Sequence, residues 1–258
     1  NAGFVGTDTF TYKANDGTVD SGSAATVTIT VLPDFSSSVD AEIGSASGFD
    51  NTFESKLQLW LDASSTDYIV KDAYNNVSEW KDLSGNGNHA LQTTSSKQPV
   101  YTSNTITLEG SNNPWLRIAD SDGLRIGQGA GKEFTVIALY NATKNNNSAI
   151  LSKRGPASST YTDYTLYISS ATKFYFGTGS SSDAGAWKSI NPNPSINNKH
   201  IAVGTLASTG EDSGTKELYI DGQEKFSVSY NQKAAATDDY LYLGAIRNHY
   251  TNENSLSK

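Results

Sequence analysis

The stretch Trp80-Lys81-Asp82-Leu83-Ser84-Gly85-Asn86-Gly87-Asn88 carries the most specific pattern in the chain. It follows Val77-Ser78-Glu79, so a short strand pattern runs into Trp80 and then stops. Beyond Asp82 the side chains of Asp, Ser and Asn alternate with glycine. Asp and Asn side chains bond to their own backbone, and glycine adopts a positive φ at no steric cost. We therefore predict a strand followed by a tight loop, and this turn chemistry outweighs the alternative that the same oxygens hold a metal ion.

Short strand patterns recur on both sides of this stretch, and no convincing amphipathic helix separates them. Asp221-Gly222 lies between two of these patterns and predicts a two-residue hairpin turn of the primed type. Many short strands at such spacing predict an all-β sandwich or jelly roll. The predicted strands are residues 57–62, 77–80, 116–118, 134–140, 149–153, 164–168, 173–176, 200–205, 217–220, 225–230 and 240–244.

Residues 1–33 form a separate pattern at the N-terminus. Thr9-Phe10-Thr11-Tyr12 and residues 25–31 alternate polar with apolar side chains, and Asn15-Asp16-Gly17 between them is a turn signal. This pattern predicts a β-hairpin with one buried face. Residues 34–55 are rich in Ser, Gly, Ala and Asp and are interpreted as a linker. Residues 56–258 form the main domain.

The composition limits the classes of function. The chain has 258 residues, 36% of them hydrophobic, which is enough for a substantial core. It has no cysteine, so disulfides and cysteine-based metal sites are excluded. A net charge of −8 argues against nucleic acid as a partner and is compatible with calcium as a stabilising ion. No stretch approaches the roughly 20 apolar residues of a membrane helix, so we expect no membrane insertion.

The order of the patterns between about residues 56 and 250 resembles the laminin-G-like, or concanavalin A-like, jelly-roll domain of bacterial surface and carbohydrate-active proteins. That family usually closes with one more strand of the form Gly-x-Ile-x-Glu-Val, for which residues 56–258 have no counterpart. The missing strand could come from a second polypeptide, from sequence beyond an inserted domain, or from residues 41–55. The resemblance is carried by Leu59-Trp60-Leu61-Asp62-Ala63, the stretch 80–88, Phe134-Thr135-Val136, Leu218-Tyr219-Ile220-Asp221-Gly222 and Tyr242-Leu243-Gly244.

Residues 1–33 resemble the last third of a bacterial cadherin-like or immunoglobulin-like repeat. The resemblance rests on residues 3–12, Asn15-Asp16-Gly17 and residues 24–31. Such repeats stand in tandem in large adhesins, so it implies an extracellular protein of the bacterial cell surface whose partners include neighbouring domains or chains of the same assembly. Two or three strands are too few for independent stability.

Two places are candidates for calcium. Asp120-Ser121-Asp122-Gly123 sets two carboxylates one residue apart before a glycine turn, as at the start of a calcium loop, although it equally fits a solvated turn. Cadherin-like repeats commonly hold calcium at the junction between domains, so the resemblance implies Asp16 and Asp34 as a second set of ligands.

Aromatic and arginine side chains in predicted loops are the candidates for ligand binding. Aromatic faces stack on the apolar faces of sugars, and arginine holds carboxylate or hydroxyl groups in a fork. The alternative is that these aromatic rings cover the core, which we favour for Trp60 and Trp80. The candidates are Trp115, Arg154, Tyr161, Tyr164, Trp187, Arg247, His249 and Tyr250.

The sequence favours binding over catalysis. It has no Glu-x-Asp-x-Glu pattern that would set paired carboxylates on one strand, and no Gly-x-Ser-x-Gly elbow. Spacing alone does not exclude a Ser–His–Asp triad, although there are only three histidines. We therefore expect a calcium-stabilised adhesin module that is not an enzyme and that recognises carbohydrate or peptide. The alternatives are a structural spacer or filament subunit associating by strand exchange, and a non-catalytic module of a polysaccharide-degrading enzyme.

Overall fold

A computed structural model describes most of the chain in two compact units, residues 1–57 and 58–258, which are presented separately. No helix among the described residues is long and apolar enough to cross a membrane. The described residues are 6–15, 17–31, 56–125, 133–143, 148–154, 162–169, 173–179, 187–192, 194–210, 213–231 and 239–245. The linker predicted at residues 34–55 lies outside them.

The first unit contains the hairpin that the sequence predicts. Strands β1 (Gly6–Tyr12) and β2 (Ala25–Val31) pair antiparallel, with Phe10 opposite Val27. Near the turn the Gly17 N–H donates to Asn15 Oδ1 over 2.7 Å, and the φ of Gly17 is +94°. The turn signal therefore acts through an Asn side chain and a glycine, as its chemistry predicts.

The apolar face of this hairpin is exposed within the described residues, so the prediction of a buried face is wrong for them. Phe10, Tyr12 and Ile29 are 52%, 53% and 48% exposed. A two-stranded hairpin supplies only one layer, and an apolar face is buried only against a second layer.

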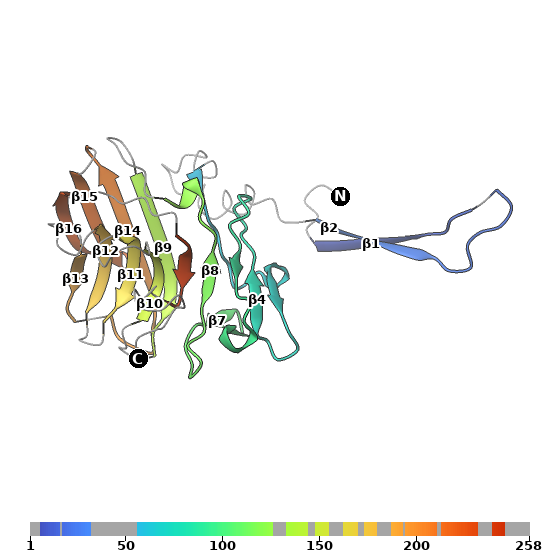
Figure 1. Ribbon diagram of the computed structural model, residues 1–258, viewed down its shortest axis with the longest axis horizontal. Helices are drawn as coiled ribbons and strands as arrows, with labels where there is room; N and C mark the ends of the chain where they lie inside the picture. The colour runs from blue at the N-terminus through green and yellow to red at the C-terminus, as the bar shows by residue number, and fades with distance from the viewer. Residues whose placement is uncertain are drawn as a thin grey trace. The chain divides into compact units, whose positions relative to one another are not determined.

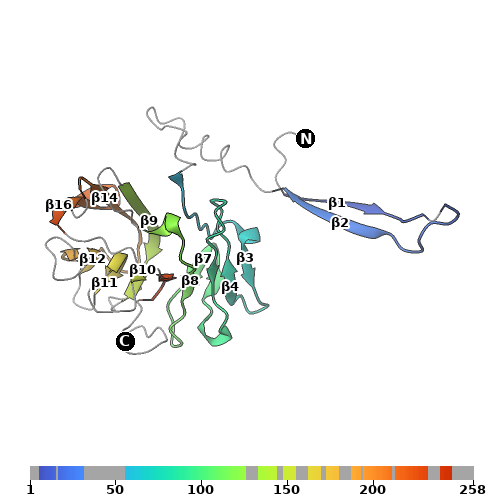
Figure 2. The same cartoon turned by 45° about the horizontal axis from the view of Figure 1, so that its top comes forward.

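The second unit is built from two main antiparallel sheets and a small hairpin. In Figure 2, β9, β14 and β16 form one layer and β10, β11 and β12 the other, and β3, β4 and β8 extend to the side of this pair (Figures 1 and 2). In spatial order the nine-stranded sheet contains β13 (Trp187–Ile190), β12 (Phe174–Gly179), β11 (Thr162–Ile168), β10 (Ser148–Arg154), β17 (Leu241–Leu243), β8 (Leu116–Ile118), β5 (Ala90–Leu91), β4 (Val77–Trp80) and β3 (Ile69–Lys71). The four-stranded sheet contains β16 (Gln223–Asn231), β15 (Ser213–Ile220), β14 (Lys199–Ser208) and β9 (Glu133–Asn141), and the small hairpin is β6 (Val100–Thr102) and β7 (Thr105–Thr107). Three short 3-10 helices, η1 (Thr66–Tyr68), η2 (Ser95–Lys97) and η3 (Asp122–Leu124), complete the described elements.

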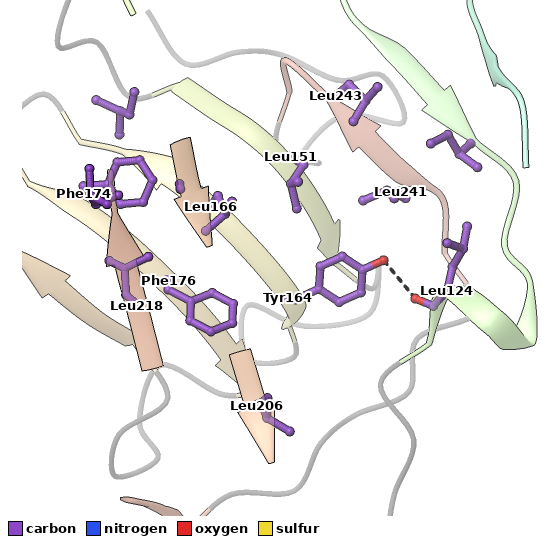
Figure 3. Packing of buried hydrophobic residues seen from close by; sticks show 14 of the residues in the cluster. Leu124, Leu151, Tyr164, Leu166, Phe174, Phe176, Leu206, Leu218, Leu241 and Leu243 are labelled. Carbon is purple, nitrogen blue, oxygen red and sulfur yellow. Dashed lines mark hydrogen bonds between the residues drawn. The ribbon is translucent and has the colours of Figure 1, made fainter. Parts of the chain in front are cut away.

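The core lies between the two main sheets. Leu166, Phe174 and Phe176 project from the nine-stranded sheet and Leu206 and Leu218 from the four-stranded sheet, and each is at most 2% exposed. Figure 3 shows these side chains packed against one another. Burying several large apolar side chains contributes about 1.5–3 kcal/mol each. The predicted all-β sandwich is confirmed.

The loop after Trp80 is organised by one buried carboxylate. Asp82 is 6% exposed, and its two oxygens accept hydrogen bonds from the backbone N–H groups of Trp60, Ser84 and Asn88 over 2.9–3.0 Å. The Ser84 hydroxyl donates to it as well, over 2.7 Å. Gly85 has a φ of +85°, which a residue with a side chain rarely adopts. The structure therefore confirms the predicted turn chemistry of residues 82–88.

Residues 57–62, predicted as a strand, belong to no strand pair among the residues that the structure describes. They lie along the Asp82 loop instead. The Leu83 N–H donates to the Trp60 carbonyl over 2.8 Å, and the Asn88 side chain donates to the Gln58 carbonyl over 2.7 Å. The segment alternates as the sequence predicts, and these hydrogen bonds join it to the Asp82 loop.

Candidate ligand-binding face

The nine-stranded sheet has a second face, which points away from the core. Directly paired residues of antiparallel strands project to the same side of a sheet. Because Leu116, Leu243, Leu151, Leu166 and Phe176 belong to the core, the residues next to them along each strand project to the other side. We call this side the outer face. One transverse row across it, in register, is Arg117, Tyr242, Ser152, Thr165, Gly177 and Trp187.

A first aromatic cluster lies on β8 and β17. The ring of Trp115 meets the ring of Tyr242 edge to face, with centroids 5.9 Å apart. Tyr240 contacts Tyr242 in the same way at 6.1 Å, and the guanidinium of Arg117 lies 4.6 Å from the centroid of the Tyr240 ring. Edge-to-face rings and a stacked guanidinium hold one another in place. Tyr242 itself is buried, at 4% exposed, so Trp115, Tyr240 and Arg117 form the accessible surface of this cluster.

A second cluster lies toward the far end of the row. The Arg154 guanidinium is 6.0 Å from the Trp187 ring centroid, and the Trp187 and Tyr175 centroids are 6.1 Å apart. Tyr167 continues the series at 6.0 Å from Tyr175. Gly177 makes room for the indole, because a Cβ at that position would lie 2.9 Å from Trp187 Cδ2. The absence of a side chain at Gly177 thus allows the indole of Trp187 to lie against the sheet at this point.

The two clusters are joined by small polar residues. Tyr242 and Trp187 stand on strands four positions apart in the sheet, a separation of about 19 Å. Between them Ser152 and Thr165 are each 1% exposed, and Thr165 Oγ1 donates to the Leu151 carbonyl over 3.0 Å. Ser152 Oγ has no hydrogen-bond partner in the described part of the chain. A buried hydroxyl without a protein partner is uncommon and suits a position where an enclosed water completes its bonding.

The structure brings together some of the residues that the sequence singled out. Trp115, Arg154 and Trp187 all contribute to the outer face. Tyr164 does not, because it is 2% exposed and its hydroxyl donates to the Leu124 carbonyl inside the core, as Figure 3 shows. Naming Tyr164 as a ligand residue is therefore wrong. Trp187 begins β13 rather than lying in a loop. Tyr161, Arg247, His249 and Tyr250 lie outside the described residues.

Sequence reasoning missed most of the tyrosines on this face. Tyr240 and Tyr242 alternate with Leu241 and Leu243, so the period of a strand already places the two tyrosines opposite the two leucines. The same period separates Tyr175 from its core neighbours. What the sequence lacks is the order of strands in the sheet, which alone brings these residues next to Trp115 and Trp187.

The calcium candidate at Asp120 and Asp122 is engaged with cationic side chains. Lys153 Nζ donates to Asp120 Oδ1 over 2.6 Å, and Arg125 bonds to both Asp120 oxygens. Arg125 also pairs with the exposed Asp122 over 3.0 Å. Partial burial alone would raise the pKa of Asp120, but the bonds from Arg125 and Lys153 outweigh it and lower that pKa. A calcium ion here would have to displace both cations.

The other calcium candidates, Asp16 and Asp34, lie outside the described residues. Within the described ranges no group of three or more His, Cys, Asp or Glu side chains is placed to hold a metal ion. Calcium therefore stays a prediction from the sequence.

A serine, a histidine and an aspartate do meet at one end of the four-stranded sheet. His200 Nδ1 lies 2.7 Å from Asp221 Oδ2, and His200 Nε2 lies 3.3 Å from Ser195 Oγ. The Ser195 carbonyl oxygen is nearer to Nε2, at 2.9 Å. Partial burial lowers the pKa of His200, but the bonds to Asp221 and to the Ser195 carbonyl raise it more.

This arrangement differs from a hydrolytic triad. In a triad the neutral histidine accepts the serine proton at Nε2. Here the nearest group to Nε2 is a carbonyl, which can only accept, so the geometry favours an imidazolium that donates at both nitrogens. Asp221 also accepts the Ile201 N–H over 2.9 Å. The contacts therefore fasten the turn at Asp221, where φ is +53°, and +74° at the following Gly222, the primed turn that the sequence predicts.

Comparisons with known proteins give fold-level similarity only. No family model matches the chain, and no curated protein matches it. Similar solved structures include a Trypanosoma rangeli sialidase in complex with 2,3-difluoro-KDN (14% identity, 72% of this chain and 28% of that one, TM-score 0.40). They also include the receptor-binding domain of botulinum neurotoxin type G (16%, 73% and 43%, 0.41) and an endo-beta-1,4-glucuronan lyase from Trichoderma reesei (20%, 69% and 78%, 0.34). The chain spans less than half of the first two, and at these TM-scores none of the three bears on what this chain binds.

Proposed function

We propose that the second unit is an extracellular carbohydrate-binding module that holds its ligand across the outer face of the nine-stranded sheet. The observation that supports this proposal is the pair of aromatic clusters, one around Tyr242 and one around Trp187, on one face and in one register. Each cluster carries an arginine stacked on a ring. Sites for small ligands typically combine aromatic side chains with a small number of polar groups.

The chemistry of the face suits a chain of sugar units. Ring faces offer apolar surface to the C–H side of a pyranose, and tyrosine hydroxyls and guanidinium groups offer hydrogen bonds to its hydroxyls or carboxylates. The separation of about 19 Å between the clusters exceeds one sugar ring, so an oligosaccharide would use both.

We infer binding without turnover. The Ser195, His200 and Asp221 group lies on the four-stranded sheet, while the aromatic clusters lie on the nine-stranded sheet. A ligand on the outer face would not reach it, since the two sheets enclose the core between them. A role within an adhesin at the bacterial cell surface, the recognition of a peptide instead of a sugar, and the use of calcium all remain proposals.

A printed array of neutral and acidic oligosaccharides tests the proposal, followed by calorimetric titration of the best-bound glycan. Trp187→Ala and Trp115→Ala should each weaken the titrated affinity about tenfold, equivalent to about 1.4 kcal/mol. Tyr74→Ala is the matched control, because Tyr74 is an aromatic residue, 83% exposed, in the turn between β3 and β4, at the opposite edge of the sheet from β13. Saturable binding that both tryptophan variants leave unchanged would refute the placement of the site. No glycan bound at all would refute carbohydrate as the ligand, and a peptide array would follow.

A further inference from the structure

Strand β9 forms one edge of the four-stranded sheet. It pairs with β14 over its whole length, from Asn141 opposite Lys199 to Glu133 opposite Ala207. In the described part of the chain no strand pairs with its other side. The backbone N–H and C=O groups on that side are a template for one more strand.

Both faces of β9 have apolar surface that a further strand would cover. On the face away from the core, Ile137 and Leu139 are 61% and 70% exposed, and Ile201, opposite Leu139 on β14, is 46% exposed. On the core side, Val136 is only half-buried, whereas Ala202 on β14 is fully buried. An added strand would therefore bury apolar side chains on both sides, which is the main favourable term in association.

The other edges of the two main sheets carry a lysine, and β9 does not. Natural edge strands commonly carry a lysine that discourages pairing with another chain. Edge strands β3, β13 and β16 carry Lys71, Lys188 and Lys225 respectively. The only charged residue of β9 is Glu133, at its end, and its centre is Val136-Ile137-Ala138. This edge therefore has the composition of an interface.

The charge pattern of β9 fits a second copy of the same strand running antiparallel. With Ile137 opposite its own symmetry mate, Glu133 of one copy falls opposite Asn141 of the other. Asn141 is itself paired with Lys199 on β14. Glu133 would then lie two strands from Lys199 of the second copy, about 10 Å between Cα atoms, which two long side chains can bridge. A two-fold axis makes this ion pair twice, whereas parallel pairing would set Glu133 against Glu133.

We propose that β9 is a self-association edge, through which two copies of this chain join antiparallel into one continuous eight-stranded sheet. The exposed Ile137 and Leu139 of both copies then form a single apolar strip across the two-fold axis. This inference does not depend on the carbohydrate site, which lies on the other sheet.

Sedimentation velocity of the full chain over a wide range of concentration tests the proposal. We expect a reversible monomer–dimer equilibrium. Ile137→Lys, which sets two lysines against each other at the centre of the interface, should weaken dimerisation at least tenfold. Val70→Lys is the matched control: Val70 is a 40%-exposed β-branched residue on the edge strand β3, and its replacement should leave the equilibrium unchanged. Far-ultraviolet circular dichroism checks that both variants remain folded.

A charge swap distinguishes dimerisation in this register from nonspecific association. Glu133→Lys should weaken the dimer by repulsion from Lys199 of the other copy, and adding Lys199→Glu should restore it. Phe10→Lys, in the exposed face of the first-unit hairpin, should have no effect. The proposal is overturned by a chain that stays monomeric at every concentration, by association that Ile137→Lys leaves intact, or by association lost in Phe10→Lys or Val70→Lys. It is also overturned if the double charge swap fails to restore the dimer.

Discussion

Lys216 makes the stability of the second unit depend on pH. It stands on β15 in line with the core residues Leu218 and Ile220, and its side chain is fully buried. Its Nζ donates to the Phe176 carbonyl over 3.2 Å and to Thr178 Oγ1 over 3.4 Å, and lies 5.3 Å from the Phe176 ring centroid. Burial, together with the smaller effect of the positive charge of Lys188, lowers the pKa of Lys216 from 10.5 to about 7.

The sign and size of the effect follow from this pKa. Between about pH 7 and pH 10.5 the unfolded chain holds a proton on Lys216 that the folded chain has released. Stability therefore rises with pH across this window, by about 1.4 kcal/mol for each pH unit, and this contribution is constant below it. Summed over the window, the cost of burying the charged amine is on the order of 5 kcal/mol.

Lys216→Met removes this cost while filling a similar volume. Because the variant also leaves the Phe176 carbonyl and the Thr178 hydroxyl without their donor, we expect a net gain of about 2–4 kcal/mol at pH 7. The free energy of unfolding should be measured by urea titration with tryptophan fluorescence at intervals from about pH 6 to pH 10. Lys225→Met, at an exposed position on β16, is the control and should follow the wild type. The reasoning is refuted if the wild-type curve is flat above pH 7, or if Lys216→Met is less stable than wild type at pH 7.

Four further predictions concern the loop, the core and the candidate chemistry. Asp82→Ala should destabilise the second unit by about 3–6 kcal/mol in urea titration, because three backbone N–H groups lose a charged acceptor; a loss under about 1 kcal/mol would contradict this. Tyr164→Phe should cost only about 1 kcal/mol in the same assay, since it removes one hydrogen bond to Leu124 and keeps the ring in the core; a loss several times larger would mean that the hydroxyl holds more than this bond. If calcium stabilises the chain as the sequence predicts, adding calcium should raise the Tm and a chelator should reverse the rise. Asp120→Asn should lower the Tm even with chelator present, because it breaks the ion pair with Lys153. Any hydrolysis of p-nitrophenyl acetate should be equal in wild type and Ser195→Ala, and its loss in the variant would show that the serine acts as a nucleophile.

The sequence by itself determined the all-β class and most strand positions. Alternation in residues such as Leu241-Tyr242-Leu243 depends only on the two-residue period of a strand, which holds wherever the strand is placed. The turns at Asn15 and Asp82 were also predicted from local chemistry, because in each a short side chain accepts a hydrogen bond from backbone two residues further on and a glycine with positive φ follows. These are interactions between residues close in sequence, although Asp82 also accepts the N–H of the distant Trp60.

Only the tertiary structure decided which face and which neighbours each strand has. Tyr164 and Tyr242 both stand in alternating strands and both are buried, yet the ring of Tyr164 lies in the core between the sheets and Tyr242 lies on the other side of the nine-stranded sheet. The burial of Lys216 and its lowered pKa likewise depend on the opposite sheet, through Phe176. The unprotected edge of β9 appears only when the sheet order is known. Each of these features depends on contacts between residues distant in sequence, and the hydrophobic periodicity of a short segment carries no information about such contacts.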